Sequence, residues 1–342
     1  MKEAVFLQEV KEIQLLKNAL TLLDWDSSTG MPEKSSPFRG EVEGYLTGLY
    51  FERSIGPVIQ EALAYFETRP EELSELGKLV FEKVKEEYAL NKNVPAERMQ
   101  EYVKVLNQAH TDWLKARAAQ DFGLLEETLT KVVAFQKEFI PYWQKEEKTP
   151  YDVLLNQFEP GMTVEKLDQV FDQVKQGIQE IRTVLAEKGT PPRTDFLSRK
   201  MTKEQQRRFV IGVVEQLGYD FSKGRLDDTV HPFMTALNRN DARITTRWEE
   251  NNFSMATFGV IHEAGHGMYE QNFDPKFDFT PLSEGASMGI HESQSLFNEI
   301  IIGSNRAFWQ KQYPFFQECA EGTFDDIAFE DFYASLKETK AS

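Results

Sequence analysis

At 342 residues the chain is long enough for one large domain or two of ordinary size, and its 40% hydrophobic and 28% charged residues fit a soluble globular protein. The formal net charge of −17 argues against a nucleic-acid partner, because phosphate binding needs clustered Lys and Arg. The single cysteine, Cys319, excludes an intramolecular disulfide and suits a reducing compartment.

The N-terminal segment predicts neither export nor membrane insertion. Residues 1–10 are charged from the start and lack the apolar core of a signal peptide. The chain has no run of about 18 apolar residues, so no membrane span is expected. We therefore expect a cytoplasmic protein with no membrane partner.

Helical periodicity dominates the N-terminal half of the chain. The patterns predict helices over residues 4–24 and 39–53, from residue 70, and twice within 94–146. A stretch rich in turn-forming residues at 150–161 predicts a break.

Helical signals continue after this break. Thr163 can cap a helix to about residue 188, and the stretch 189–194 is the most linker-like in the chain. Thr202 and Gln205 have the form of a capping box, which opens a helix expected to end near Gly218.

Residues 225–248 indicate β-structure instead. The segment 242–248 contains β-branched residues in alternation and follows a turn signal at 238–241. Together with the segment 225–233 it predicts a small antiparallel β-element, whose strand at 243–246 could pair with an extended peptide. Because no repeat or clean linker is visible, residues 1–342 are expected to form one helical domain, with an N-terminal part (1–190) and a site-bearing part (191–342).

The pattern His262-Glu263-x-x-His266 carries the clearest chemical signal. On a helix, residues four apart lie on the same face, so both imidazoles can bind one metal ion. Glu263 can then take a proton from a metal-bound water, as in zinc peptidases. This predicts a zinc hydrolase site.

A catalytic zinc site usually needs a third protein ligand. The helical pattern after residue 283 offers Glu292, which would complete a His₂Glu set of the thermolysin type. Spacing favours Glu292 as the third ligand but leaves His291, Glu284 and Asp278 as alternatives. If Glu292 is the ligand, His291 could contact the metal-bound water or the developing oxyanion.

Four motifs carry a resemblance to a known family: His231-Pro232-Phe233, Asp241-x-Arg243-x-Thr245, His262-Glu263-x-x-His266 and His291-Glu292-Ser293-Gln294. In their order and spacing the chain resembles the M32 metallocarboxypeptidases, also called carboxypeptidase Taq or thermostable carboxypeptidase 1. The resemblance spans nearly the whole chain. It implies that Glu292 is the third zinc ligand.

The resemblance implies a mainly α, long-helix, gluzincin-like peptidase fold, with the small β-element next to the zinc helix and a deep groove. The implied activity is the release of single residues from peptide C-termini. The implied cofactor is one Zn²⁺ per chain, with Co²⁺ as the other candidate, and the usual assembly is a homodimer.

The sequence departs from the family in one respect. Family members run to roughly 500 residues, well beyond one average domain. Two family motifs have no counterpart here: an Ile-Arg-x-x-Ala-Asp segment, implied to help bind the substrate carboxylate, and a Gly-x-x-Gln-Asp-x-His-Trp segment. We therefore expect a chain truncated at its C-terminus, either active as a carboxypeptidase or a weak or silent metal- and peptide-binding pseudo-enzyme. Another chain that supplies the missing segment is a candidate partner.

Several motif residues have two open interpretations each. Arg243 either pairs with Asp241 or contacts substrate. Thr245 belongs to the same motif and is a candidate for the same contact with substrate or for support of the site. His231 either supports the metal site or packs locally. Glu284 either orients a ligand imidazole or caps the following helix.

Overall fold

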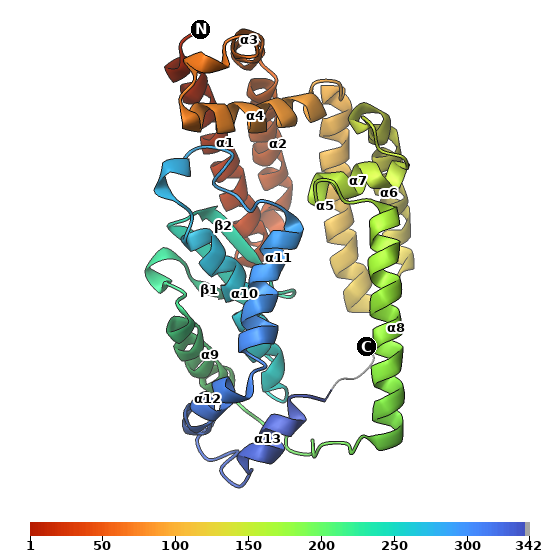
Figure 1. The fold of residues 1–342 in the computed structure, drawn as a ribbon, viewed down its shortest axis with the longest axis vertical. Helices are drawn as coiled ribbons and strands as arrows, with labels where there is room; N and C mark the ends of the chain where they lie inside the picture. Colours follow the sequence, from red (N-terminus) through yellow and green to blue (C-terminus); the bar gives the residue numbers. More distant parts are fainter. Residues whose placement is uncertain (339–342) are drawn as a thin grey trace. The chain divides into compact units, whose positions relative to one another are not determined.

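The computed structural model describes residues 1–338, without the side chains at 33 and 96. The chain is mainly helical, as predicted, with one three-stranded sheet (Figure 1). It divides into two compact units: Met1–Lys166 with Phe277–Leu282, and Leu167–Lys276 with the chain from Ser283 onward. The assignment of residues 1–342 to one domain stays a prediction. Among the described residues, no helix combines the length and the apolar character needed to cross a membrane.

The first unit consists of helices around two apolar clusters. Its helices are α1 (Glu3–Thr29), α2 (Ser36–Ser54), α3 (Pro57–Phe66), α4 (Glu75–Asn91), α5 (Ala96–Ala119), α6 (Gly123–Trp143) and α7 (Pro150–Phe158), with 3₁₀ turns at Glu33–Ser35 and Pro70–Glu72. The larger cluster includes Phe6, Ile59 and Phe66, all fully buried, and Leu282 packs against it. The smaller cluster lies between α5 and α6 and contains Phe139.

The helices predicted over 4–24, over 39–53 and within 94–146 are confirmed. Two local predictions are wrong. The helix expected from residue 70 begins only at Glu75, because Ser74 accepts the backbone N–H of Gly77 and caps it there. The break expected at 150–161 contains α7, which a reciprocal capping box between Thr149 and Asp152 opens.

The second unit contains the sheet and the remaining helices, except for Val164–Lys166 and Phe277, which belong to the first unit. The remaining elements are α8 (Val164–Lys188), α9 (Lys203–Leu217), β1 (Leu226–Asp228), β2 (Met234–Asn238), β3 (Asp241–Thr246), α10 (Phe253–Gln271), α11 (Met288–Leu296), a π-helical segment (Phe297–Ile302), α12 (Arg306–Cys319) and α13 (Phe329–Ser335), with 3₁₀ turns at Phe221–Lys223 and Pro275–Phe277. The capping box of Thr202 and Gln205 is confirmed, and Gly218 ends α9 with φ 114°.

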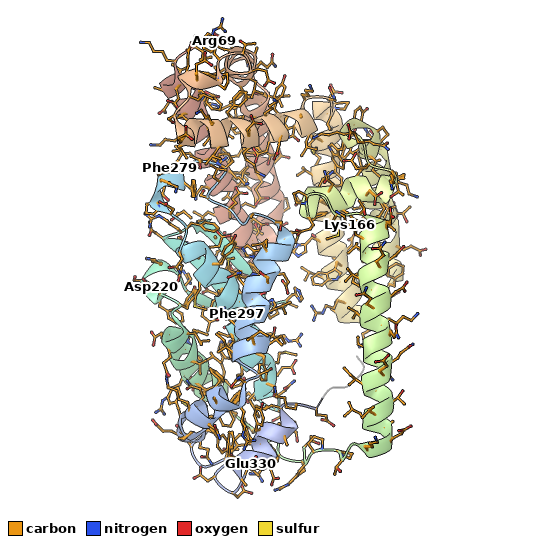
Figure 2. All side chains as sticks on the ribbon, viewed as in Figure 1. Arg69, Lys166, Asp220, Phe279, Phe297 and Glu330 are labelled. Atoms are coloured by element: carbon orange, nitrogen blue, oxygen red, sulfur yellow. The ribbon has the colours of Figure 1, made fainter. Side chains whose placement is uncertain are left out.

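Helix α8 differs from the other long helices of this unit. No described residue of α8 is buried, and its side chains stand out from the helix along its length (Figure 2). Exposed apolar side chains recur along it at helical spacing: Phe171, Val174, Ile178, Ile181 and Leu185.

The sheet is mixed rather than purely antiparallel. Strands β2 and β3 form an antiparallel pair, with Thr235 opposite Arg243. The predicted segment 225–233 contributes β1 rather than β2, so the antiparallel partner of β3 lies outside the predicted strand. Strand β1 pairs parallel to β3 on its other side, so the strand order is β1-β3-β2. After β1 the chain crosses to the opposite edge of the sheet, where it forms β2. The hairpin then places β3 between β1 and β2, parallel to β1. Because β3 is central, the prediction that it pairs with an extended peptide is wrong: only the outer strands have a free edge.

The core of the second unit is aromatic and holds α10 in place. Phe209, Phe253, Trp309, Phe316 and Phe332 are at most 1% exposed and belong to one cluster. Helix α10 packs against α9, α11, β2 and β3. The helix predicted to bind metal is therefore surrounded by fixed elements, which limits the movement of its side chains.

Candidate metal centre

Helix α10 carries both histidines of the His-Glu-x-x-His pattern. Its residues Val260, Ile261 and Ala264 are fully buried and anchor the helix in the aromatic core. His262 and His266 lie one turn apart, with ring centroids separated by 5.0 Å. The local sequence thus forms the helix and presents two imidazoles together, as predicted.

Helix α11 supplies a carboxylate to the same point. The Glu292 oxygens lie 3.7 Å from Nε2 of His262 and 3.4 Å from Nε2 of His266. One atom from each of these three residues falls within 4.8 Å of the others, and no second group of this kind occurs among the described side chains. The structure therefore brings together the two histidines and Glu292, and not the alternatives Asp278, Glu284 or His291.

The donor set fits a divalent transition metal. Two imidazoles and one carboxylate are the protein ligands of thermolysin-type zinc sites. Burial lowers the pKa of His266 to about 4, so this imidazole is neutral at pH 7, as metal binding requires. Nδ1 of His262 lies 2.7 Å from Oε2 of Glu299. That hydrogen bond directs Nε2 of His262 toward Glu292 and raises the pKa of the imidazole.

Glu263 has the environment of a proton acceptor. It is 8% exposed, and burial raises the pKa of its carboxyl to about 7. Nearby negative charge on Glu292 raises this pKa further, whereas His262 lowers it. A bound cation would also favour the ionised form. A carboxylate whose pKa lies near the working pH is suited to general-base chemistry.

Two carboxylates of the site are absent from the sequence predictions: Glu299 and Glu270. Glu299 lies in the π-helical segment Phe297–Ile302 and bonds to His262, as described above. Glu270 lies one turn after His266 and approaches Nε2 of His291 to 2.9 Å. The four-residue spacing of 262, 266 and 270 was a usable signal for Glu270. The π-helical turn that presents Glu299 has no comparable sequence pattern.

Comparisons with known proteins agree with this geometry. The family model described as carboxypeptidase Taq (M32) metallopeptidase matches residues 5–342. Carboxypeptidase 1 of Bacillus subtilis is 42% identical over 340 residues, which are 99% of this chain and 68% of that protein. Thermostable carboxypeptidase 1 of Thermus thermophilus is 31% identical over 343 residues, which are 97% of this chain and 67% of that protein.

The chain belongs to the M32 family. Solved structures have the same fold: the BsuCP crystal structure superposes with a TM-score of 0.95 at 42% identity, covering 99% of this chain and 68% of that one. The M32 carboxypeptidase from Deinococcus radiodurans R1 gives a TM-score of 0.88 at 32% identity, over 96% of this chain and 66% of that one. M32 membership places this protein among metal-dependent carboxypeptidases, as its motifs predicted.

The side chains of the Asp241-x-Arg243-x-Thr245 motif form ion pairs and hydrogen bonds with each other and with Phe233 of the His231-Pro232-Phe233 motif. Arg243 forms a two-pronged ion pair with Asp241, with both N–O distances at 2.8 Å. The hydroxyl of Thr245 donates to the carbonyl of Phe233 and accepts from its N–H, each at 2.8 Å. Asp241, Arg243 and Thr245 therefore stabilise the strand pair and the segment that follows His231.

The remaining predicted M32 site residues lie in loops or at the start of α11. His231 is exposed between β1 and β2, and the structure shows it in no hydrogen bond or ion pair with another described residue. Glu284 is exposed on the loop before α11, whose cap is Ser287: its side chain accepts the N–H of Ile290. His291 stacks on the ring of His266 at 4.4 Å between centroids. Its Nε2 faces Glu270, which leaves that nitrogen engaged within the protein.

Proposed function

We propose that this protein is a zinc-dependent carboxypeptidase that hydrolyses the C-terminal peptide bond of peptides. The observation that carries the proposal is the convergence of His262, His266 and Glu292 on one point beside the buried Glu263. The M32 relatives named as carboxypeptidases support the reaction class. Cobalt is the second candidate metal. The cytoplasmic location and the homodimer stay predictions.

Some of these residues would hold the metal, and Glu263 would transfer a proton. His262, His266 and Glu292 would hold the cation, and Glu299 would fix the orientation of the His262 ring. A divalent cation bound there would supply Lewis acidity to the scissile carbonyl and to the attacking water. Glu263 would accept a proton from that water and then deliver it to the leaving amine.

Arg243 is a poor candidate for binding the substrate carboxylate. Its guanidinium already faces both oxygens of Asp241, and its side chain is only 16% exposed. Breaking that pair would leave Asp241 without its ionic partner in a partly buried position. We therefore assign Arg243 and Asp241 to holding β3, the interpretation that does not involve substrate.

The test compares a blocked dipeptide that has a free carboxylate with its amidated form. We expect chelator-sensitive release from the free acid only, restored by added zinc. Equal cleavage of the amide would refute carboxypeptidase action. Glu263→Gln should bind zinc and lose activity, whereas the exposed Glu187→Gln control should keep both. Full activity in Glu263→Gln would refute the base assignment, and zinc binding without release from any peptide would support the pseudo-enzyme.

A further inference from the structure

Helix α10 meets α11 and the π-helical segment that follows it along a seam of paired polar side chains. In order along α10, His262 faces Glu299, His266 faces Glu292, and Glu270 faces His291. The residue numbers rise along α10 while those of their partners fall, so the two helical segments run antiparallel here. The pair of Glu270 and His291 lies one turn beyond the metal-binding group and takes no part in it.

Glu292 depends on the position of its helix. Its side chain is 49% exposed, in contrast to 12% for His266. Within residues 1–338, the structure shows its carboxylate in ion pairs with the two imidazoles and with no other group. Because few neighbouring side chains hold this carboxylate, it lies beside the two imidazoles only if the backbone of α11 is correctly placed.

His291, the residue before Glu292, is fixed on several sides. Its Nε2 lies 2.9 Å from Oε1 of Glu270, whose side chain is 8% exposed. Its ring stacks on His266, and Tyr269 approaches it edge-on at 5.5 Å between centroids. A Cβ at Gly285 would lie 2.6 Å from the ring, so this position has no room for a larger residue.

The helix backbones also touch beside this pair. A Cβ placed on Gly265 would lie 2.7 Å from both the carbonyl oxygen of Gln294 and the Cα of Ser295. Such an approach is open only to glycine. The seam therefore has a steric contact at Gly265 and a polar contact at Glu270, and the two together define how far α11 lies from α10 and in which register.

We propose that Glu270 and His291 are a positioning pair that holds α11 in register with α10, so that Glu292 reaches the two imidazoles. The inference rests on the proposed metal site. It assigns His291 a role within the protein in place of the contact with water or oxyanion expected from the sequence. Neither residue of the pair belongs to the metal-binding group, and both act through Glu292.

The experiment measures zinc affinity of the full chain by competition with a chromophoric chelator. Glu270→Ala should lower the affinity about 10- to 100-fold, the usual effect of removing a residue that orients a ligand. Glu270→Gln keeps an oxygen acceptor for Nε2 of His291 and should restore most of it. The visible spectrum of the cobalt-loaded protein should change in Glu270→Ala and stay close to wild type in Glu270→Gln.

A double-mutant cycle separates positioning from a general loss of stability. In a Glu292→Ala background, adding Glu270→Ala should change zinc affinity by less than twofold, because the ligand being positioned is already absent. An equal loss in both backgrounds, or wild-type affinity in folded Glu270→Ala, would overturn the proposal. If Glu270→Ala does not fold, His291→Phe replaces it in the cycle, since it keeps a stacking ring and removes Nε2. His291→Gln, which can still donate to Glu270, is its rescue variant.

The same measurements separate this inference from the proposed function. Zinc binding by wild type without peptide hydrolysis would refute the proposed function and leave the positioning pair standing. Hydrolysis by wild type together with unchanged zinc affinity in every variant of the pair would refute the positioning role alone. Failure of wild type to bind zinc would overturn both.

Discussion

The substitution Gly265→Ala tests whether the spacing of α10 and α11 controls activity. The added Cβ would lie 2.7 Å from two backbone atoms of α11, about 0.7 Å short of the 3.4 Å at which ordinary contact begins. Backbone atoms of a packed helix cannot rotate away as a side chain can, so α11 must retreat. Glu292 moves with it.

The expected cost falls on activity more than on stability. Overpacking lowers the free energy of unfolding by about 1–3 kcal/mol, whereas replacing glycine by alanine in a helix raises it by about 1 kcal/mol. The free energy of unfolding should therefore drop by about 0–2 kcal/mol. A ligand displaced by close to 1 Å should reduce kcat/KM by about 10- to 100-fold, because such misplacement disrupts the reacting geometry.

The assay is kcat/KM on the blocked dipeptide, with urea unfolding of the same samples. Gly259→Ala is the matched control on α10, because the nearest atom to its added Cβ is the hydroxyl of Thr246 at an ordinary 3.9 Å. This control should unfold at equal or higher urea and keep full activity. Wild-type kcat/KM in Gly265→Ala, or the same loss in Gly259→Ala, would refute the spacing argument.

Three further predictions concern other parts of the protein. Glu299→Ala should lower zinc affinity about 10- to 100-fold in chelator competition, since His262 loses the group that orients it, and Glu299→Gln should lose less. Trp309→Ala should destabilise the chain by about 3–5 kcal/mol in urea unfolding, because Trp309 is fully buried. The pKa of Asp152 is lowered by the N–H of Val164, so its carboxylate should stabilise the fold at neutral pH. This contribution should be present above the unfolded pKa of roughly 4 and disappear as the pH falls through the lower folded value.

Each of these has an outcome that contradicts it. Equal zinc affinity in Glu299→Ala and wild type would show that the His262 ring is oriented by other contacts. An unfolding midpoint unchanged in Trp309→Ala would mean that the aromatic core is not what stabilises the second unit. For Asp152→Asn, unfolding should differ from wild type at pH 7 and converge with it in acid. A difference that persists unchanged in acid would exclude the carboxylate charge as its cause.

Local features of the fold were predictable where short-range chemistry decides them. The capping box of Thr202 and Gln205 and the end of α9 at Gly218 follow from hydrogen bonds within one turn. The turn predicted at 238–241 joins β2 to β3, although β2 itself was not predicted as a strand. The parallel pairing of β1 depends on where the chain crosses the sheet, which no local pattern specifies.

The candidate site shows the same division. By itself, the sequence determined the candidate metal-binding helix: His262 and His266 share a face because helical geometry repeats every 3.6 residues, and Glu263 is the predicted acid–base group. It also indicated Glu292, through a motif of the M32 family. Only the tertiary structure decided how Glu292 reaches the imidazoles, because that depends on the approach of two helix backbones at Gly265. The contacts of Glu270 and Glu299 were decided in the same way, since each carboxylate pairs with a histidine of another segment, more than 20 residues away along the chain.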